Sequence, residues 1–245
     1  MTYLPITGRP LNGVSPAGIV CGDPARADRI AGHLESGTRL SEKREYRAYQ
    51  GLYQGQTITV CSHGVGAPGA AAAFEELIVA GAQRIIRVGT CGGLQPDIDA
   101  GQLIIAQAAV QRTGYGRELV PDGFPAVANL ALTLALQRAA ADKDHTTTTG
   151  TVLTRDLFYR GVGGAAAVDY PTMSEAGVLA VEMECAALFL VGALRRVATA
   201  AILVADGNVL KAVESVDTYE PGRPVVQNAV TTAAIIALSA LVIDS

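Results

Sequence analysis

Arg87 to Leu94 read R-V-G-T-C-G-G-L and directly follow the apolar run Arg84-Ile85-Ile86. The run predicts a buried strand of a parallel sheet, and the glycines predict a turn at the carboxyl end of that strand. Arginine offers a planar fork of donors that matches phosphate, threonine adds a hydroxyl, and glycine lets backbone N–H groups approach an anion. A glycine-rich turn without a ligand is the plainer interpretation of this segment alone. A second segment of the same character, Gly22-Asp23-Pro24-Ala25-Arg26, follows another predicted strand and favours an oxyanion-binding site.

Length and composition narrow the class of protein. The chain has 245 residues, of which 49% are hydrophobic and only 17% are charged. This balance predicts one globular domain over residues 1–245, with some apolar surface buried between subunits of a homo-oligomer. The net charge of −4 and the lack of a Lys/Arg-rich run argue against a nucleic-acid partner.

Several features predict a cytoplasmic protein that binds neither a metal nor a membrane. The start of the chain lacks the basic and apolar regions of a signal peptide. The four cysteines form no C-x-x-C pair and the three histidines are far apart, which predicts reduced core thiols and no metal site. The apolar stretch Ala229–Ile243 is shorter than a membrane span and is predicted to be a buried helix.

Predicted strands alternate with predicted helices along the whole chain. This order predicts an α/β fold of three layers, α/β/α, around a central mixed, mostly parallel twisted sheet. The predicted strands are Gly18–Cys21, Glu45–Tyr53, Thr57–Ser62, Arg84–Val88, Gln102–Ala106, Thr149–Leu153, Val178–Val181 and Thr199–Ala205. The predicted helices are Pro24–Leu34, Pro68–Ala80, Pro125–Ala140, Glu184–Arg196 and Pro224–Leu241.

The fold class also predicts where a ligand binds. In open α/β sheets, ligands gather beyond the carboxyl ends of the parallel strands. Segments with the chemistry of a binding site are predicted to lie together at that edge, as turns that follow strands: Gly22–Arg26, His63–Gly69, Gly89–Gly93, Val181–Glu184 and Asp206-Gly207.

The segment from Gly64 to Gly69 has the form G-x-G-x-x-G and suggests a dinucleotide site. That interpretation requires an acidic residue at the end of the next strand, to hold a ribose hydroxyl. The next strand instead ends in Gly89-Thr90-Cys91. A glycine loop that lines the site of a smaller ligand is therefore favoured over a nicotinamide cofactor.

Two acidic segments are candidates for contact with a substrate. In Glu182-Met183-Glu184, a carboxylate can accept hydrogen bonds from two vicinal ribose hydroxyls, or a glutamate can simply favour a helix N-terminus. Adjacent residues do not share a face, so at most one of these carboxylates is expected to point into a site. Asp206 follows a buried strand, where it either caps a turn or acts as a general acid with a raised pKa.

Together these segments resemble the purine nucleoside phosphorylase and uridine phosphorylase family, of the type that assembles as trimers of dimers. The resemblance runs nearly end to end and rests on the order and spacing of seven motifs. They are Gly22-Asp23-Pro24-x-Arg26, Arg44-Glu45-Tyr46, His63-Gly64-x-Gly66, Arg87-x-Gly89-Thr90-x-Gly92, Asp156-Leu157-Phe158-Tyr159, Val181-Glu182-Met183-Glu184 and Asp206-Gly207.

The resemblance implies a role for each matching residue. Phosphate is expected to bind Gly22, Arg26, Arg87 and Thr90, with Arg44 reaching in from the neighbouring subunit. The nucleoside is expected to contact Val65, Phe158, Tyr159, Glu182, Met183, Glu184 and Asp206. Asp206 and Arg87 are expected to be catalytic. No metal or organic cofactor is implied, and inorganic phosphate is a co-substrate.

Two departures from the family pattern bear on the substrate. The N-terminal region Thr2–Ile6 lacks the histidine that usually contacts the ribose 5′-hydroxyl, which leaves a 5′-methylthio nucleoside open as a substrate. Residues Arg160–Gly164 lack, in register, the glutamine and arginine pair with which uridine phosphorylases grip uracil. With Asp206 at the purine position, reversible phosphorolysis of a purine nucleoside is favoured. Uridine or 5′-methylthioadenosine phosphorolysis, and nucleoside binding without turnover, are the alternatives.

Overall fold

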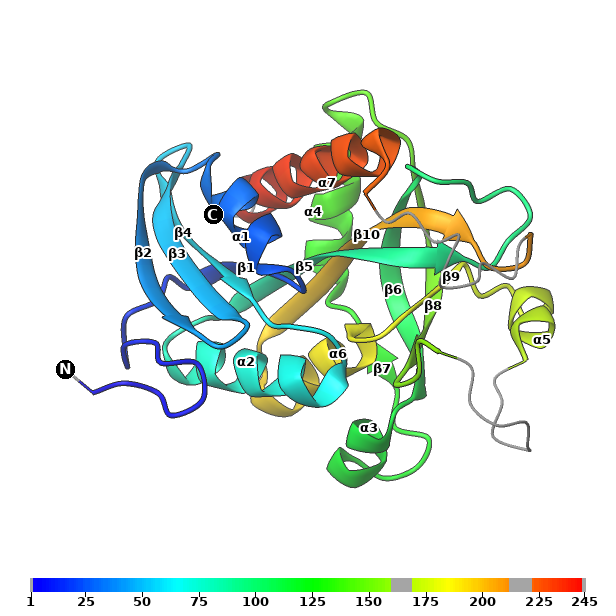
Figure 1. Ribbon diagram of the computed structural model, residues 1–245, viewed down its shortest axis with the longest axis horizontal. Coiled ribbons are helices and arrows are strands. Elements are labelled where there is room, and N and C mark those ends of the chain that lie inside the picture. The colour runs from blue at the N-terminus through cyan, green and yellow to red at the C-terminus, as the bar shows by residue number, and fades with distance from the viewer. Residues whose placement is uncertain (1, 160–168, 212–221, 244–245) are drawn as a thin grey trace.

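The computed structural model describes residues 2–159, 169–211 and 222–243 of the chain (Figure 1). The predicted segment Arg160–Gly164 therefore lies outside the described residues. The strands are β1 (Ala17–Cys21), β2 (Glu35–Lys43), β3 (Tyr46–Tyr53), β4 (Gln56–Ser62), β5 (Arg84–Gly93), β6 (Leu103–Arg112), β7 (Ala126–Val127), β8 (Thr147–Arg155), β9 (Ala180–Glu182) and β10 (Ala198–Asn208). The helices are α1 (Pro24–Ala31), α2 (Ala67–Val79), α3 (Gly114–Leu119), α4 (Leu130–Ala141), α5 (Tyr170–Glu175), α6 (Cys185–Arg195) and α7 (Pro224–Ile243).

All of these strands belong to one mixed sheet, as predicted. The strands β2, β3, β4, β1 and β5 lie side by side in that order. The two longest ladders, β5 with β10 and β6 with β8, are parallel. Beyond β5 the sheet closes on itself, because β5 pairs with both β10 and β9, and β6 and β8 connect those two strands. The sequence predicted an open sheet and gave no sign of this closure.

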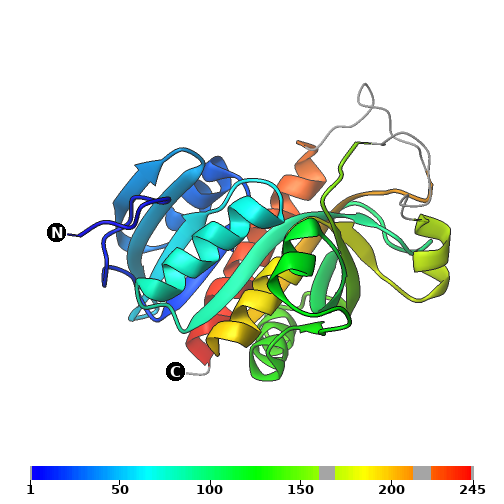
Figure 2. The same ribbon diagram turned by 90° about the horizontal axis from the view of Figure 1, so that it is seen from below.

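Helices cover both faces of the sheet, which confirms the three layers (Figures 1 and 2). Helices α1, α4 and α7 pack on one face, and α2 and α6 pack on the other. Neighbouring residues of β1 show why both faces are apolar: Ile19 packs with the first group of helices and Val20 with the second. Successive side chains of a strand point to opposite faces, so a strand buried on both sides is apolar throughout.

Several element boundaries differ from the sequence-based expectation. The helix predicted from Pro125 begins only at Leu130, because Ala126–Val127 pairs with β6 and the side chain of Asn129 caps the helix by accepting from the Leu132 N–H. Strand β2 was not predicted, since most of its side chains are exposed and it has no apolar run. The short helices α3 and α5 were also missed. The predicted hairpin of β3 and β4 is confirmed, with Gln54 and Gly55 both at positive φ in the turn.

The C-terminal helix α7 is confirmed as a core helix. Among the described residues it is long and apolar enough to cross a membrane by length and composition, with a mean hydropathy of 1.9. However, Val230, Ile236 and Leu241 are buried in the core beneath the sheet. An apolar helix that packs against a sheet passes the same test as a membrane span.

Truncation of a buried α7 side chain tests this packing. The variant Ile236→Ala removes a fully buried side chain and is expected to lower the free energy of unfolding by about 2–5 kcal/mol. The exposed Thr231→Ala in the same helix is the control, with an expected change within about 0.5 kcal/mol. Urea denaturation measures both, and equal effects of the two substitutions would contradict the packing described here.

Candidate active site

The first two predicted segments lie side by side at the carboxyl ends of β1 and β4. The His63 N–H donates to the carbonyl of Cys21 over 2.8 Å, and the Gly64 N–H donates to the carbonyl of Gly22 over 3.0 Å. The side chain of Asp23 caps α1 by accepting from the N–H groups of Ala25 and Arg26. Two glycine turns and a helix N-terminus therefore meet at one edge of the sheet, as predicted.

Two other predicted turns are parts of strands. Strand β5 continues through Gly93 and β10 continues to Asn208, so neither Gly89–Gly93 nor Asp206-Gly207 is a loop. The two strands pair with each other over this region, and the register shifts between Ala205 and Gly207. Asp206 is the extra residue of this bulge. A bulge re-aims a side chain within a strand, which explains why a site residue occurs there without a loop.

Arg87 is the buried centre of the site. Only 3% of its surface is exposed. Its Nη2 donates to Oε2 of Glu184 and lies 3.5 Å from Oε2 of Glu182. Although burial opposes the charge, these carboxylates hold the pKa of Arg87 above its ordinary value. The guanidinium group is therefore charged and held in one orientation.

Gly89 makes the position of Arg87 possible. Residues two apart in a strand share a face, and a Cβ at Gly89 would lie 1.6 Å from Nη1 of Arg87. From the sequence, this glycine is predicted to let an anion approach the backbone. In the structure, the group that lies against Gly89 is the guanidinium of Arg87.

Glu184 links three elements of the site. Its Oε1 accepts from the N–H of Gly66, the N-cap residue of α2, over 2.6 Å, while Oε2 accepts from Arg87. Burial alone would raise the pKa of Glu184, but the charge of Arg87 and the Gly66 hydrogen bond hold that pKa below its ordinary value. Glu184 is therefore an ionised acceptor at the start of α6.

Glu182 has a different set of contacts. Its carboxylate accepts from the hydroxyl of Thr154 and from the N–H groups of Glu184 and Cys185, the latter two over 2.7 and 2.9 Å. Burial raises the pKa of Glu182 by more than the charge of Arg87 lowers it. These contacts favour the helix-capping interpretation of Glu182 over contact with a nucleoside. Glu182 fixes the backbone from which Glu184 projects.

Arg26 brings a second guanidinium to the same region. Its Nη1 donates to the carbonyl of Val88 in β5 over 3.3 Å. Burial and the nearby positive charge of Arg87 lower the pKa of Arg26. Within the described part of the chain, Nε of Arg26 and both Nε and Nη1 of Arg87 are buried without a hydrogen-bond partner. Unpaired buried donors on neighbouring cations are costly, and a bound anion would satisfy them.

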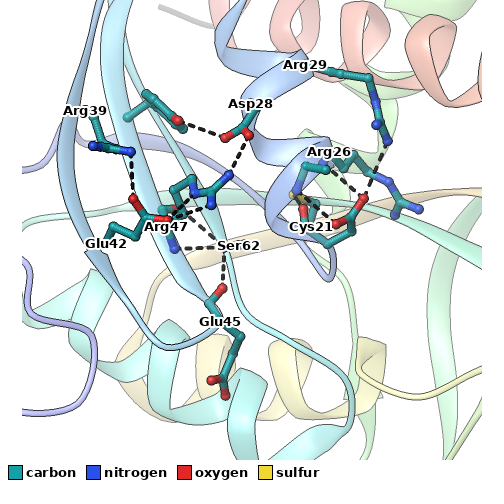
Figure 3. A network of polar contacts seen from close by, with 12 residues as sticks. Cys21, Arg26, Asp28, Arg29, Arg39, Glu42, Glu45, Arg47 and Ser62 are labelled. Atoms are coloured by element: carbon teal, nitrogen blue, oxygen red, sulfur yellow. Dashed lines mark hydrogen bonds and ion pairs between the residues drawn. The ribbon is translucent and has the colours of Figure 1, made fainter.

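Arg44 lies outside this cluster within one chain. It occupies the turn between β2 and β3 with a φ of 56°, and its side chain is exposed. The hairpin that carries it is nevertheless fixed to the helix that carries Arg26 (Figure 3). Arg47 of β3 makes ion pairs of 2.5 Å with Asp28 of α1 and 2.6 Å with Glu42 of β2.

Three of the predicted base and sugar contacts are exposed. Val65, Phe158 and Tyr159 are 79%, 59% and 65% exposed. The two aromatic rings meet edge to face, with centroids 5.2 Å apart. Met183 and Thr90 are half-buried. No cluster of three or more potential metal ligands was found in the described ranges.

Arg223, which directly precedes α7, was not predicted from the sequence. Its Nη2 donates to the backbone carbonyl of Asp206, 17 residues earlier. Among the described residues, its Nε is buried without a partner. Nothing in the local sequence marks this arginine, because its role depends on how α7 returns to the end of β10.

The steric argument at Gly89 gives a testable result. The variant Gly89→Ala is expected to displace Arg87 and break a buried ion pair, which should lower the free energy of unfolding by about 3–5 kcal/mol. Gly18→Ala in β1 is the control, because a Cβ at Gly18 would meet its neighbours at 3.4 Å or more. Denaturant titration compares them. A loss at Gly89 no larger than that at Gly18 would refute the steric role.

The chain is similar in sequence to known proteins over most of its length. The sequence profile of the phosphorylase superfamily matches residues 16–242. The uridine phosphorylase of Treponema pallidum (strain Nichols) is 39% identical over 212 residues, which cover 82% of this chain and 81% of that protein. The purine nucleoside phosphorylase of Plasmodium falciparum (isolate 3D7) is 38% identical over 196 residues, which cover 79% of each.

Solved structures match over nearly the whole chain. The crystal structure of uridine phosphorylase from Vibrio fischeri ES114 has a TM-score of 0.87 at 35% identity and covers 99% of this chain and 98% of that chain. The crystal structure of purine nucleoside phosphorylase from Toxoplasma gondii in complex with immucillin-H has a TM-score of 0.88 at 33% identity, with 98% and 97% covered. The chain therefore belongs to the phosphorylase superfamily and is an enzyme of the nucleoside phosphorylase type.

Proposed function

We propose that the enzyme is a purine nucleoside phosphorylase, which converts a purine (deoxy)ribonucleoside and phosphate into free base and (deoxy)ribose 1-phosphate. The observation that carries this proposal is the shared position of Arg87. One N–H edge of its guanidinium holds Glu184, the expected sugar-binding carboxylate, and its other buried N–H groups have no partner in the described chain. A phosphate bound there would lie next to the sugar that it attacks.

The proposed mechanism relies on positioning and charge. Phosphate attacks C1′ while the glycosidic bond breaks, and positive charge builds on the sugar. Arg26 and Arg87 hold the nucleophile, and ionised Glu184 accepts hydrogen bonds from the ribose hydroxyls. Charges that are already fixed in position lower the barrier, because they do not have to reorganise during the reaction. No metal or organic cofactor has a step in this scheme, and phosphate is the co-substrate.

Local charge supports the proposed contribution of Arg44 from a second subunit. Ionised Glu184 already offsets the charge of Arg87, so Arg26 alone faces a phosphate dianion with an uncompensated positive charge. A further cation would stabilise the bound dianion. Arg44 is exposed on the turn between β2 and β3 and is suited to reach another copy of the chain. The proposal therefore includes a homo-oligomer with shared sites.

The choice of base rests on Asp206. The relatives include uridine, purine nucleoside and guanosine phosphorylases. Similarity to these proteins therefore does not favour one nucleoside base over another. We assign protonated Asp206 to the purine N7, because a purine leaves more readily when it receives a proton. Arg223 holds the backbone of Asp206 and thereby positions the acid. Phe158 and Tyr159 offer exposed aromatic faces near which a base could stack.

A base-release assay on inosine, guanosine, adenosine, uridine and 5′-methylthioadenosine tests the proposal. Phosphate-dependent release of a purine base from inosine, guanosine or adenosine supports it. Release of uracil alone, or of 5′-methylthioadenosine's base alone, favours the alternative phosphorylases. Binding of nucleosides without release in the presence of phosphate favours the non-catalytic alternative. A cytoplasmic location and the absence of nucleic-acid or membrane partners remain part of the proposal.

The general-acid role of Asp206 predicts that its substitution lowers the rate by an amount that depends on the substrate. Asp206→Asn is expected to slow guanosine phosphorolysis by about 10²–10⁴-fold. The same variant should lose much less rate on 7-methylguanosine, whose base leaves as a neutral species. Steady-state kcat on both substrates measures the difference. Equal losses would show that Asp206 does not donate a proton.

The shared site predicts complementation between two inactive variants. Arg44→Ala and Glu184→Gln subunits are each expected to be nearly inactive alone. In randomly mixed two-fold pairs, about one quarter of the sites should contain both native residues and regain activity. Each variant mixed with itself is the control. Verified mixed oligomers without recovered activity would rule out a contribution of Arg44 in trans.

A further inference from the structure

His63 is a buried histidine that the proposed function leaves without a task. It is the first residue after β4, and none of its surface is exposed. Its ring packs edge to face on Phe74 of α2, with ring centroids 5.3 Å apart. A histidine buried on an apolar helix usually has both ring nitrogens satisfied. Here Nε2 is buried without a partner in the described chain.

The contact of the other ring nitrogen determines the chemistry of Nε2. Nδ1 lies 2.9 Å from the carbonyl oxygen of Gly64. A carbonyl only accepts, so Nδ1 carries the hydrogen. Burial lowers the pKa of His63 to about 4, and the ring is therefore neutral near pH 7. Nε2 is then a bare lone pair, an acceptor among a group of donors.

The ring lies against the expected phosphate site. A Cβ at Gly22 would be 3.9 Å from Cε1 of His63, the ring carbon bonded to both nitrogens. The charges of Glu184, Arg87 and Arg26 all act on the ring. The unpaired buried N–H groups of Arg26 and Arg87 therefore share this region with one unpaired acceptor.

This set of groups distinguishes between similar anions. Hydrogen phosphate presents oxygens that accept and one O–H that donates, whereas sulfate only accepts near neutral pH. A site made of donors alone would bind the two dianions similarly. A fixed acceptor favours the protonated anion, because sulfate would place an oxygen lone pair against that of Nε2.

We propose that Nε2 of His63 accepts the O–H of bound hydrogen phosphate and makes the enzyme select phosphate over sulfate. This inference rests on the proposed function, since it assumes that Arg26 and Arg87 bind phosphate. The ring has no exposed surface, so an anion reaches it only when neighbouring side chains move apart. Half-buried Arg26 is the most exposed of the charged groups around the ring.

The competing explanation is that His63 only braces the glycine turn through Nδ1. Two substitutions test the roles of Nδ1 and Nε2 separately. In His63→Asn, the side-chain amide can replace Nδ1 and keep the hydrogen bond to Gly64, but nothing replaces Nε2. In His63→Gln, the longer side chain can place its amide oxygen near the position of Nε2, but the contact of Nδ1 is lost. A bracing role spares the Asn variant, and an anion-binding role spares the Gln variant.

The experiment measures the affinity of each protein for three anions. Equilibrium titration with phosphate, arsenate and sulfate is combined with the KM for phosphate and the inhibition constant of sulfate. The wild-type enzyme is expected to prefer phosphate and arsenate, which both carry an O–H, over sulfate by about tenfold or more. His63→Asn should weaken phosphate and arsenate binding about tenfold and leave sulfate within about twofold. His63→Gln should keep most of the preference.

Three results would overturn the assignment. The wild-type enzyme could bind sulfate as tightly as phosphate, the Asn variant could weaken all three anions equally, or the Gln variant could lose the preference while the Asn variant keeps it. Unchanged sulfate binding shows that a variant is folded. Because titration requires no turnover, a missing anion preference is distinguishable from a failure of the wild-type enzyme to release base with phosphate.

Discussion

The buried ion pair between Arg87 and Glu184 is the interaction on which the rest of the site depends. It joins β5 in the sheet to the N-terminus of α6. Desolvation offsets much of the attraction in a buried ion pair, so such a pair is a weak source of stability. Its effect here is to orient two charged groups at one edge of the sheet. Nε and Nη1 of the guanidinium have no partner in the described chain, and in the proposed function these two nitrogens donate to the bound phosphate.

Several surrounding residues position Arg87 and Glu184. Gly89 leaves the space in which the guanidinium lies, and Gly66 donates to Glu184 from the start of α2. Glu182 caps α6 and so fixes the backbone of Glu184. The closure of the sheet between β5 and β9 brings the start of α6 against the strand that carries Arg87. The positions of Arg87 and Glu184 thus depend on the turn at Gly66, on the cap that Glu182 provides and on the pairing of β5 with β9.

The sequence was informative where burial imposes a pattern. Strands apolar on both faces, such as β1 and β10, carry continuous apolar runs, and proline or a capping residue marks the start of several helices. Strand β2 escaped prediction because its side chains are mostly exposed. The proximity of Arg26 and Arg87 could be predicted, because each belongs to a motif next to a continuous apolar run. The contact of Arg223 could not be predicted, because Arg223 binds the backbone carbonyl of Asp206, 17 residues earlier, and no local sequence pattern marks it. The distinct roles of Glu182 and Glu184 also required coordinates, since both match the same motif.

A crystal structure of the enzyme with phosphate tests most directly whether one guanidinium serves both halves of the site. The account predicts a phosphate ion within hydrogen-bond distance of Arg26 and of Nε or Nη1 of Arg87, while Nη2 of Arg87 remains on Glu184. A phosphate bound elsewhere, or an Arg87 that leaves Glu184 and turns toward solvent, would contradict it.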